Sequence, residues 1–306
     1  MKEKFKFQNI VVVTLVLLLA FAIAFACVFS HIGGVCNAAT DFKTVGKCAY
    51  MVDYATGTVL YARGENERLP IASMVKIMTS LLTLECVDSG KISLDDDVVV
   101  SQNAASMGGS QVFLDANSTH KVGDLLKTVI VASANDSCVA LAEHISGSVE
   151  TFVARMNERA EQLGMKNTVF KNCNGLDEEG HITSAYDVAL MSRELTKHEK
   201  IFDYTSIWLD NLRGGKTQIV NTNKLLKTYN GITGLKTGTT NDAGCCMSAT
   251  ATRGDVSLIS VVLGCKTGKE RFADAAALLD YGFANVSVKE LTLPEDMPKS
   301  IEVNGG

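Results

Sequence analysis

The sequence has no excess of positive charge. Its 306 residues include 29 Lys and Arg against 34 Asp and Glu, a formal net charge of −5. Residues 1–38 hold three of the lysines and one of the glutamates, so the remainder carries a net charge of −7. Proteins that bind nucleic acid through its phosphates present clustered basic residues, and no such cluster occurs here. We therefore expect no nucleic-acid partner.

Regular cysteine spacing and metal-binding histidine pairs are also lacking. After residue 38 there are seven cysteines, an odd number without regular spacing, so they do not form a disulfide framework. We expect most of them to be small, buried core residues. The five histidines show no spacing typical of metal ligands. The sequence thus predicts no metal site and no cofactor.

The adjacent pair Cys245-Cys246 lies within ten residues of Lys236. A disulfide between these neighbours could modulate a site there. The favoured interpretation is that both are strand residues that face opposite sides of a sheet.

The first 39 residues have the layout of an export signal. Three lysines within the first six residues precede an uncharged, apolar stretch from Ile10 to Phe29. A small-residue cleavage point follows at 36–39, although about 20 apolar residues can also span a bilayer. We expect residues 1–39 to be a signal peptide or an N-terminal membrane anchor. The protein would then be extracytoplasmic, either secreted or attached to the outer face of the cytoplasmic membrane.

One helix carries a lysine where burial is expected. Only two charged residues occur from Ile71 to Val87, which predicts a helix that is apolar almost all round. Pro70 suits its first turn. A buried amine loses basicity from its reference pKa of ~10.4. Because Ser73 lies one helical turn before Lys76 on the same face, the pair predicts a weak nucleophile beside a base.

Ser-x-x-Lys is a loose pattern, and the chain contains a second copy, Ser118-Thr119-His120-Lys121. That copy lies in a polar run that predicts a loop. Nothing in a loop forces the lysine to lose its charge, so the expected burial of Lys76 favours the first copy.

The remaining pattern predicts an α/β domain over residues 40–285. Tyr54–Gly57 separates two predicted strands, and three further strands are expected late in the chain. The predicted strands are Lys47–Asp53, Thr58–Arg63, Gly231–Thr240, Cys245–Thr252 and Val256–Leu263. The predicted helices after the first are Val122–Ala132, Asp136–Ile145, Phe152–Leu163, Ala185–Lys197 and Lys269–Phe283. Strands joined by short turns at both ends predict a mostly antiparallel sheet flanked by helices.

Acyl transfer by a serine also needs a proton relay and donors for the developing oxyanion. Ser133-Ala134-Asn135 lies between two predicted helices, where a turn can project both side chains. Lys236-Thr237-Gly238 lies on a predicted strand, where Gly238 permits close backbone approach and Lys236 supplies positive charge. Alone, each pattern is more often a capping or solvated turn. Each also has another copy, Ser101-Gln102-Asn103 and Lys266-Thr267-Gly268.

In order and spacing, Ser73–Lys76, Ser133–Asn135 and Lys236–Gly238 together resemble the penicillin-recognising serine enzymes. Longer segments are similar to the low-molecular-mass penicillin-binding proteins that act as D-alanyl-D-alanine carboxypeptidases. These segments are Thr56–Tyr61, Ser133–Asp136 with Ala140–His144, Gly175–Asp177 with Gly180–Ala185, Gly234–Thr240 and Leu258–Gly264. The resemblance covers nearly everything from Lys47 to Phe283. It implies the serine β-lactamase/DD-peptidase-like fold with a helical insertion.

The resemblance also implies the catalytic residues Ser73, Lys76, Ser133 and Asn135. Neutral Lys76 would take the proton of Ser73, which attacks the carbonyl between two D-alanines of a peptidoglycan stem peptide. Ser133 would pass a proton towards the leaving amine, and water would release the acyl-enzyme. A β-lactam antibiotic would acylate the same serine.

By the same resemblance, substrate binding falls to Lys236, Thr237, Gly238, Thr239 and Arg271. The N–H groups of Ser73 and Thr239 would hold the oxyanion. Asn135 and the positive charge of Lys236 would orient the substrate, and Arg271 would lie near its terminal carboxylate.

Three other functions remain open. A β-lactamase shares the fold, but the Glu-x-x-x-Asn pattern of its best-known class is missing between Asn135 and Lys236. A DD-endopeptidase uses the same machinery on cross-links. A non-catalytic, penicillin-sensing wall protein is disfavoured because all motif residues are present.

Relatives usually continue into a second, all-β domain. We expect residues 286–306 to be a tail or the start of a truncated C-terminal β domain, because about 20 residues cannot form an independent one. We expect membrane association if residues 1–39 are retained as an anchor.

Overall fold

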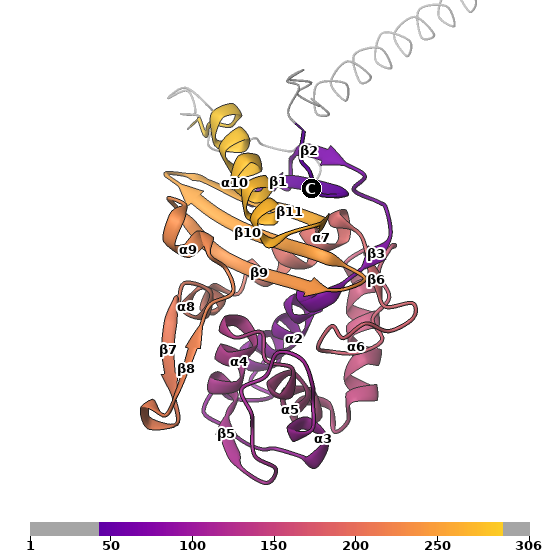
Figure 1. The fold of residues 1–306 in the computed structure, drawn as a ribbon, viewed down its shortest axis with the longest axis vertical. Coiled ribbons are helices and arrows are strands. Elements are labelled where there is room, and N and C mark those ends of the chain that lie inside the picture. Colours follow the sequence, from indigo (N-terminus) through magenta and orange to yellow (C-terminus); the bar gives the residue numbers. More distant parts are fainter. Residues whose placement is uncertain (1–42, 290–306) are drawn as a thin grey trace, which may run out of the picture. The chain divides into compact units, whose positions relative to one another are not determined.

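Five antiparallel strands form the main sheet (Figure 1). The computed structural model describes residues 43–289; the predicted leader and all but the start of the predicted C-terminal segment lie outside these residues. The sheet order is β2-β1-β11-β10-β9, so strands from both ends of the domain pair with each other. The strands are β1 (Cys48–Asp53), β2 (Val59–Arg63), β9 (Ile232–Thr240), β10 (Gly244–Arg253) and β11 (Val256–Cys265). The predicted fold class is confirmed.

Two helices cover opposite faces of this sheet (Figure 1). Ser260 of β11 donates to the Ala275 carbonyl of α10 (Gly268–Asn285) at 3.4 Å. Ser248 of β10 bonds Ser192 of α7 (Ala185–Thr196) at 2.8 Å. Because Ser248 lies opposite Val261, the neighbour of Ser260, the two serines face opposite sides.

A helical region occupies the middle of the chain and lies against one side of the sheet (Figure 1). At its centre is α2 (Lys76–Asp88), whose residues from Lys76 to Leu84 are all buried. Around it pack α4 (Val122–Val131), α5 (Asn135–Ser146) and α6 (Val149–Gln162), with the short α3 (Gln102–Ala105) against α5. This is the predicted helical insertion. Packing by these helices removes the Lys76–Leu84 part of α2 from water on every side.

The start of the serine-bearing helix differs from the prediction. Residues 72–75 form a 3₁₀ turn, η1 (Ala72–Val75), before α2 begins at Lys76. Pro70 does not lie in the first helical turn, because Leu69 and Pro70 form a two-residue strand, β3, that pairs with β6 (Ile182–Thr183). Proline is tolerated in so short an edge strand, where it has no ladder bond to lose.

Small elements complete the described chain. The predicted loop around the second Ser-x-x-Lys is in part a strand, because β5 (Thr119–Lys121) pairs with β4 (Asp97–Val99). The others are η2 (Glu199–Ile201), α8 (Phe202–Thr205), β7 (Leu209–Leu212), η3 (Arg213–Gly215), β8 (Thr217–Val220) and α9 (Leu225–Thr228). None of the helices within residues 43–289 combines the length and apolar composition needed to cross a bilayer.

Candidate active site

Ser73 and Lys76 meet at the junction of η1 and α2. The Lys76 Nζ lies 2.9 Å from the Ser73 Oγ, and the lysine side chain is fully buried. Burial disfavours the charged amine and so lowers the pKa of Lys76. A buried amine with a lowered pKa, one hydrogen bond from a hydroxyl, is suited to act as a base.

Two oxygens besides Ser73 contact the Lys76 amine. The Lys76 Nζ donates to Asn135 Oδ1 at 2.7 Å and to the Asn174 carbonyl. A neutral amine has two N–H bonds, which these two acceptors satisfy. Its lone pair is then free to accept the Ser73 O–H. The hydrogen-bond partners therefore fit the uncharged form of the base.

Ser133 and Asn135 lie in the turn between α4 and α5. Ser133 adopts a left-handed conformation with φ of 59°, which is uncommon outside glycine and is often found at functional sites. Asn135 begins α5, and its Nδ2 donates to the Gly108 carbonyl at 2.7 Å while its Oδ1 accepts from Lys76. The Asn135 amide thus joins a neighbouring loop to the base.

Lys236 lies on the edge strand β9, and its side chain reaches Ser133 in the α4–α5 turn. Its Nζ lies 3.0 Å from Ser133 Oγ and 2.8 Å from the Thr237 carbonyl, and only 1% of the residue is exposed. Burial, with the charge of Lys76 as a further cause, lowers the pKa of Lys236 well below its usual value. Among residues 43–289 no carboxylate pairs with Lys236. The site therefore offers a desolvated amine whose charge an arriving anion would stabilise.

Gly238 allows β9 to contact the helix start. A Cβ at Gly238 would lie 3.1 Å from the Ser73 nitrogen and 3.2 Å from the Met74 nitrogen, closer than nine in ten real Cβ contacts. Thr239 follows directly on the strand, opposite Cys245 of β10. The two N–H groups predicted to hold the oxyanion, those of Ser73 and Thr239, thus belong to elements that touch at Gly238.

Thr237 of β9 and Arg271 of α10 lie next to Gly238 and Thr239. Thr237 is buried, and its Oγ1 donates to Thr222 Oγ1 at 2.6 Å. From α10, the Arg271 Nη1 donates to the Gly238 carbonyl and to Thr239 Oγ1, each at 3.0 Å. Arg271 Nε is buried and has no partner among the described residues. All nine site residues predicted from the sequence therefore converge on η1, the α4–α5 turn and β9.

The structure adds a loop that the sequence did not identify as part of the site. Gly175 has φ of +89°, and a Cβ there would lie 2.2 Å from the Ala72 carbonyl oxygen. The loop that contains Gly175 therefore packs directly against η1, and the carbonyl of the preceding residue, Asn174, accepts a hydrogen bond from Lys76. Any residue has a carbonyl, so no side-chain pattern could reveal this contact. Ala72 itself has φ of 50° and immediately precedes Ser73.

The other copies of the three patterns have ordinary roles. Lys121 forms an exposed ion pair with Asp97, at 2.7 Å. Ser101 caps α3 by accepting the Ala104 N–H at 2.9 Å. Thr267 caps α10 in a capping box with Glu270. None of these residues lies in the cluster around Lys76.

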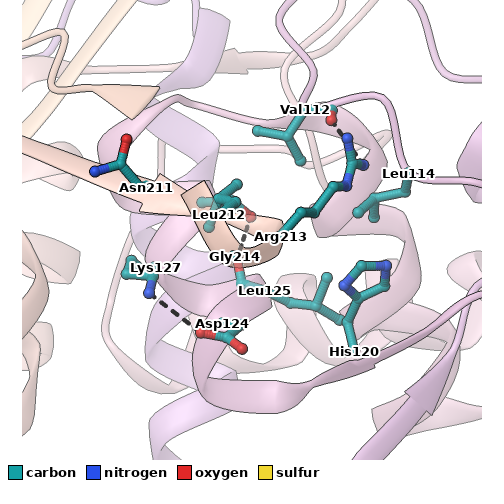
Figure 2. Close-up of a pocket in the computed structure, with 11 residues that line it drawn as sticks. Val112, Leu114, His120, Asp124, Leu125, Lys127, Asn211, Leu212, Arg213 and Gly214 are labelled. Carbon is teal, nitrogen blue, oxygen red and sulfur yellow. Dashed lines mark hydrogen bonds and ion pairs between the residues drawn. The ribbon is translucent and has the colours of Figure 1, made fainter. Parts of the chain in front are cut away.

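A cavity of about 260 Å³ opens between α4 and the β7–β8 hairpin (Figure 2). Its charged groups are already engaged. Lys127 pairs with Asp124 at 3.2 Å, and the Arg213 Nη2 donates to the Val112 carbonyl at 3.0 Å. This cavity contains no nucleophile paired with a base.

The described cysteines are free and buried, including Cys245 and Cys246, which are consecutive residues of β10. Thiol burial raises the pKa of Cys246 to about 11, so this thiol stays protonated at neutral pH. Within residues 43–289 no group of His, Cys, Asp and Glu could hold a metal ion.

Comparison with known proteins gives one consistent family. A family model described as D-alanyl-D-alanine carboxypeptidase matches residues 36–267. The chain is 46% identical over 263 residues to the D-alanyl-D-alanine carboxypeptidase DacF of Bacillus subtilis strain 168, which covers 85% of this chain and 68% of DacF. It is 40% identical over 240 residues to DacC of Escherichia coli K12, covering 76% of this chain and 60% of DacC.

Solved structures agree. Penicillin-binding protein 6B from Escherichia coli has a TM-score of 0.78 at 34% identity, with 82% of this chain and 81% of that chain covered. Penicillin-binding protein D2 from Listeria monocytogenes, solved in an ampicillin-bound form, has a TM-score of 0.72 at 31% identity. That match covers 80% of this chain and 100% of the Listeria chain.

Proposed function

Because this chain belongs to the D-alanyl-D-alanine carboxypeptidase family, we propose that it removes the terminal D-alanine from peptidoglycan stem pentapeptides through an acyl-enzyme on Ser73. The observation that carries this proposal is the 2.9 Å contact between a fully buried Lys76 amine and the Ser73 hydroxyl. The chain spans 68% of DacF and 60% of DacC, so the activity is argued from the site itself.

Acylation begins with proton transfer from Ser73 to Lys76. Burial lowers the pKa of Lys76 and so keeps the amine uncharged, with its lone pair available, and the Asn135 and Asn174 oxygens accept its two N–H bonds. The Ser73 oxygen then attacks the carbonyl of the penultimate D-alanine. The N–H groups of Ser73 and Thr239 receive the developing negative charge, and losing one such donor typically costs roughly 10²–10³ in rate.

No carboxylate of the described chain pairs with Lys236 in the free site. The terminal carboxylate of the substrate would supply this negatively charged partner. An anion next to Lys236 raises the pKa of this amine and so favours its protonated form. Thr237 and Thr239 lie on the same strand, and Arg271 of α10 adds positive charge beside them, donating to the Gly238 carbonyl and to Thr239 Oγ1. Carboxylate recognition by Lys236 thus coincides with substrate arrival.

Proton delivery to the leaving D-alanine runs through Ser133. Its hydroxyl lies 3.0 Å from Lys236 Nζ, so a protonated Lys236 can donate to Ser133 while Ser133 donates to the leaving amine. Water then attacks the ester carbonyl and passes one proton through Ser133 to Lys236, which restores the proton that Lys236 gave to the leaving amine. The bond to Ser73 Oγ breaks, and the Ser73 oxygen takes back the proton held by Lys76.

A β-lactam would acylate Ser73 in the same way. The structural relative from Listeria is known in an ampicillin-bound form, which supports antibiotic binding at the equivalent site. We expect a long-lived penicilloyl adduct rather than fast hydrolysis, because the chain has no Glu-x-x-x-Asn after its second motif.

A peptidoglycan substrate requires an extracytoplasmic location, either secreted or attached to the outer face of the cytoplasmic membrane. The organisation that we propose is a leader over 1–39, a catalytic domain over 40–285 and a tail or partial β domain over 286–306. Fractionation of cells, with sizing of the mature protein, tests whether the leader is cleaved.

The test of the activity is product analysis with purified protein. Native protein should release D-alanine from a stem pentapeptide, and Ser73→Ala should release none while keeping the native fold by circular dichroism. Release by Ser73→Ala at the native rate would overturn the proposal. A cross-linked dimer assayed in parallel separates an endopeptidase from a carboxypeptidase, and rapid turnover of benzylpenicillin would identify a β-lactamase.

A further inference from the structure

A second cavity, of about 410 Å³, lies beside the nucleophile. Its wall includes Ile71 and Ala72, the residues before Ser73, together with His181 and the first residue of β6, Ile182. Asp242, which follows the end of β9, completes the side nearest the strand. The cavity is therefore built from the same segments that build the catalytic site.

Negative charge dominates this cavity. Asp177, Glu178, Glu179 and Asp242 line it, and Asp177, Glu179 and Asp242 form no ion pair with any Lys or Arg of the described chain. One cationic side chain, that of Lys171, comes close to this loop, because its Cε would lie 3.3 Å from a Cβ at Gly180. Four carboxylates against one amine attract a cationic ligand.

His181 provides an independent sign of a ligand. It is 3% exposed, lines the cavity, and accepts the Lys171 N–H on Nδ1 at 2.7 Å. Burial lowers the pKa of His181 to about 4, so the neutral ring carries its proton on Nε2. That Nε2 is buried and has no partner among residues 43–289. Unpaired buried donors are rare, and this one calls for a ligand oxygen.

The path of the substrate leads to this cavity. The sheet order ends at β9, so one edge of β9 has no strand partner in the described sheet and can accept an extended peptide. The proposed function, on which this inference rests, places the terminal carboxylate at Lys236 and the scissile carbonyl at Thr239. Continuing in the same direction along the strand leads to Thr240 and Asp242.

We propose that this acidic cavity binds the side-chain ammonium of the diamino acid that precedes the two D-alanines in a peptidoglycan stem. Each residue of an extended strand spans about 3.3 Å, so this residue lies just beyond the scissile bond, beside Asp242. Glu179 and Asp242 supply the unpaired carboxylates, and the Nε2–H of His181 donates to an oxygen of the same ligand. A metal ion is disfavoured because no group of the described residues has metal-binding geometry.

The experiment compares two pentapeptides that differ only at the third residue: lysine with a free side-chain amine, and lysine with that amine acetylated. The native enzyme should cleave the free-amine peptide with kcat/KM about fivefold higher, typical of a few partly exposed charge contacts. The double variant Glu179→Gln/Asp242→Asn should lose this preference. A matched double variant of exposed acids elsewhere, Glu161→Gln/Asp255→Asn, should keep it.

Equal kcat/KM for the two peptides in the native enzyme, or an unchanged preference in Glu179→Gln/Asp242→Asn, would overturn the inference. Acylation by benzylpenicillin, which carries no ammonium, should be the same in all three proteins. If the peptides are cleaved without preference, the inference fails alone; if neither peptide is cleaved and no adduct forms, the proposed function fails.

A third peptide with meso-diaminopimelate at the same position distinguishes the two sources of the ammonium. Its side chain carries a carboxylate beside the amine, which the Nε2–H of His181 could bind. A larger preference for this peptide supports the cavity as a site for both groups. Equal preference for the lysine and diaminopimelate peptides supports recognition of the ammonium alone.

Discussion

Each of the three catalytic patterns occurs twice in this chain, and the two sets have opposite surroundings. Lys76 is fully buried against Ser73, whereas Lys121 is exposed and paired with Asp97. Ser133 sits in a strained turn beside Lys236, whereas Ser101 simply caps α3. The difference shows that desolvation and convergence of distant segments, rather than the local pattern, create the chemistry.

The largest expected effect comes from removing the two lysines in turn. Lys76→Ala should lower kcat/KM for D-alanine release by roughly 10²–10⁴, the usual contribution of a positioned base. Lys121→Ala should leave kcat/KM unchanged, because its ammonium contacts only Asp97 at the surface. Steady-state kinetics on a stem pentapeptide measures both. Equal losses in the two variants would contradict the comparison.

Alanine substitution of the glycine in each of the two Lys-Thr-Gly copies should also have very different effects on the rate of acylation. Gly238→Ala places a Cβ 3.1 Å from the Ser73 nitrogen, so the strand must shift and the oxyanion donors with it. We expect a loss of roughly 10²–10³ in the rate of penicillin acylation. Gly268→Ala meets nothing closer than 3.6 Å at the start of α10 and should keep the native rate. A native rate in Gly238→Ala would show that close approach is not required.

The pH dependence of acylation reports the state of the base. Lys76 acts when neutral, so kcat/KM should rise as pH increases through the pKa of Lys76, and burial moves this rise below the ~10.4 of a free lysine. Ion pairing with Asp97 raises the pKa of Lys121, which therefore stays charged over the same range. Stopped-flow acylation of the native enzyme and Lys121→Ala should give the same profile. A pH profile that shifts in Lys121→Ala would show that Lys121, and not Lys76, is the group whose titration controls acylation.

The smallest effect concerns stability alone. Ser101→Ala removes the cap of α3 and should cost about 0.5–2 kcal/mol of unfolding free energy without changing kcat/KM. Urea unfolding and the peptidase assay on one preparation measure both quantities. Loss of activity without loss of stability would mean that this second Ser-x-Asn takes part in the reaction.

Much of the fold could be predicted from the sequence, because the strong hydrophobic patterns decide it. The hairpin at Tyr54–Gly57, the three late strands and the helices from Val122 onward are where the patterns placed them. Pro70 was placed wrongly in a helix, since its pairing with Ile182 depends on a segment over a hundred residues away. The strand character of Thr119–Lys121 was missed because this polar segment becomes a strand only by pairing with Asp97–Val99.

The site could be predicted from motif order but not from local physics. The burial of Lys76 follows from the apolar helix around it, whereas the burial of Lys236 depends on β9 packing against the α4–α5 turn. The Asn174 carbonyl carries no signal in the sequence. The unpaired Nε2 of His181 likewise appears only when the cavity around it is formed.

The most direct test of the base is the titration of Lys76 itself. Protein labelled with [ε-¹³C]lysine gives one Cε resonance per lysine in NMR spectra, and Lys76→Arg and Lys121→Arg assign the two signals. The Lys76 signal should titrate below ~10.4 and the Lys121 signal above it. A Lys76 amine that titrates near the value of a free lysine would contradict the assignment of Lys76 as the neutral base.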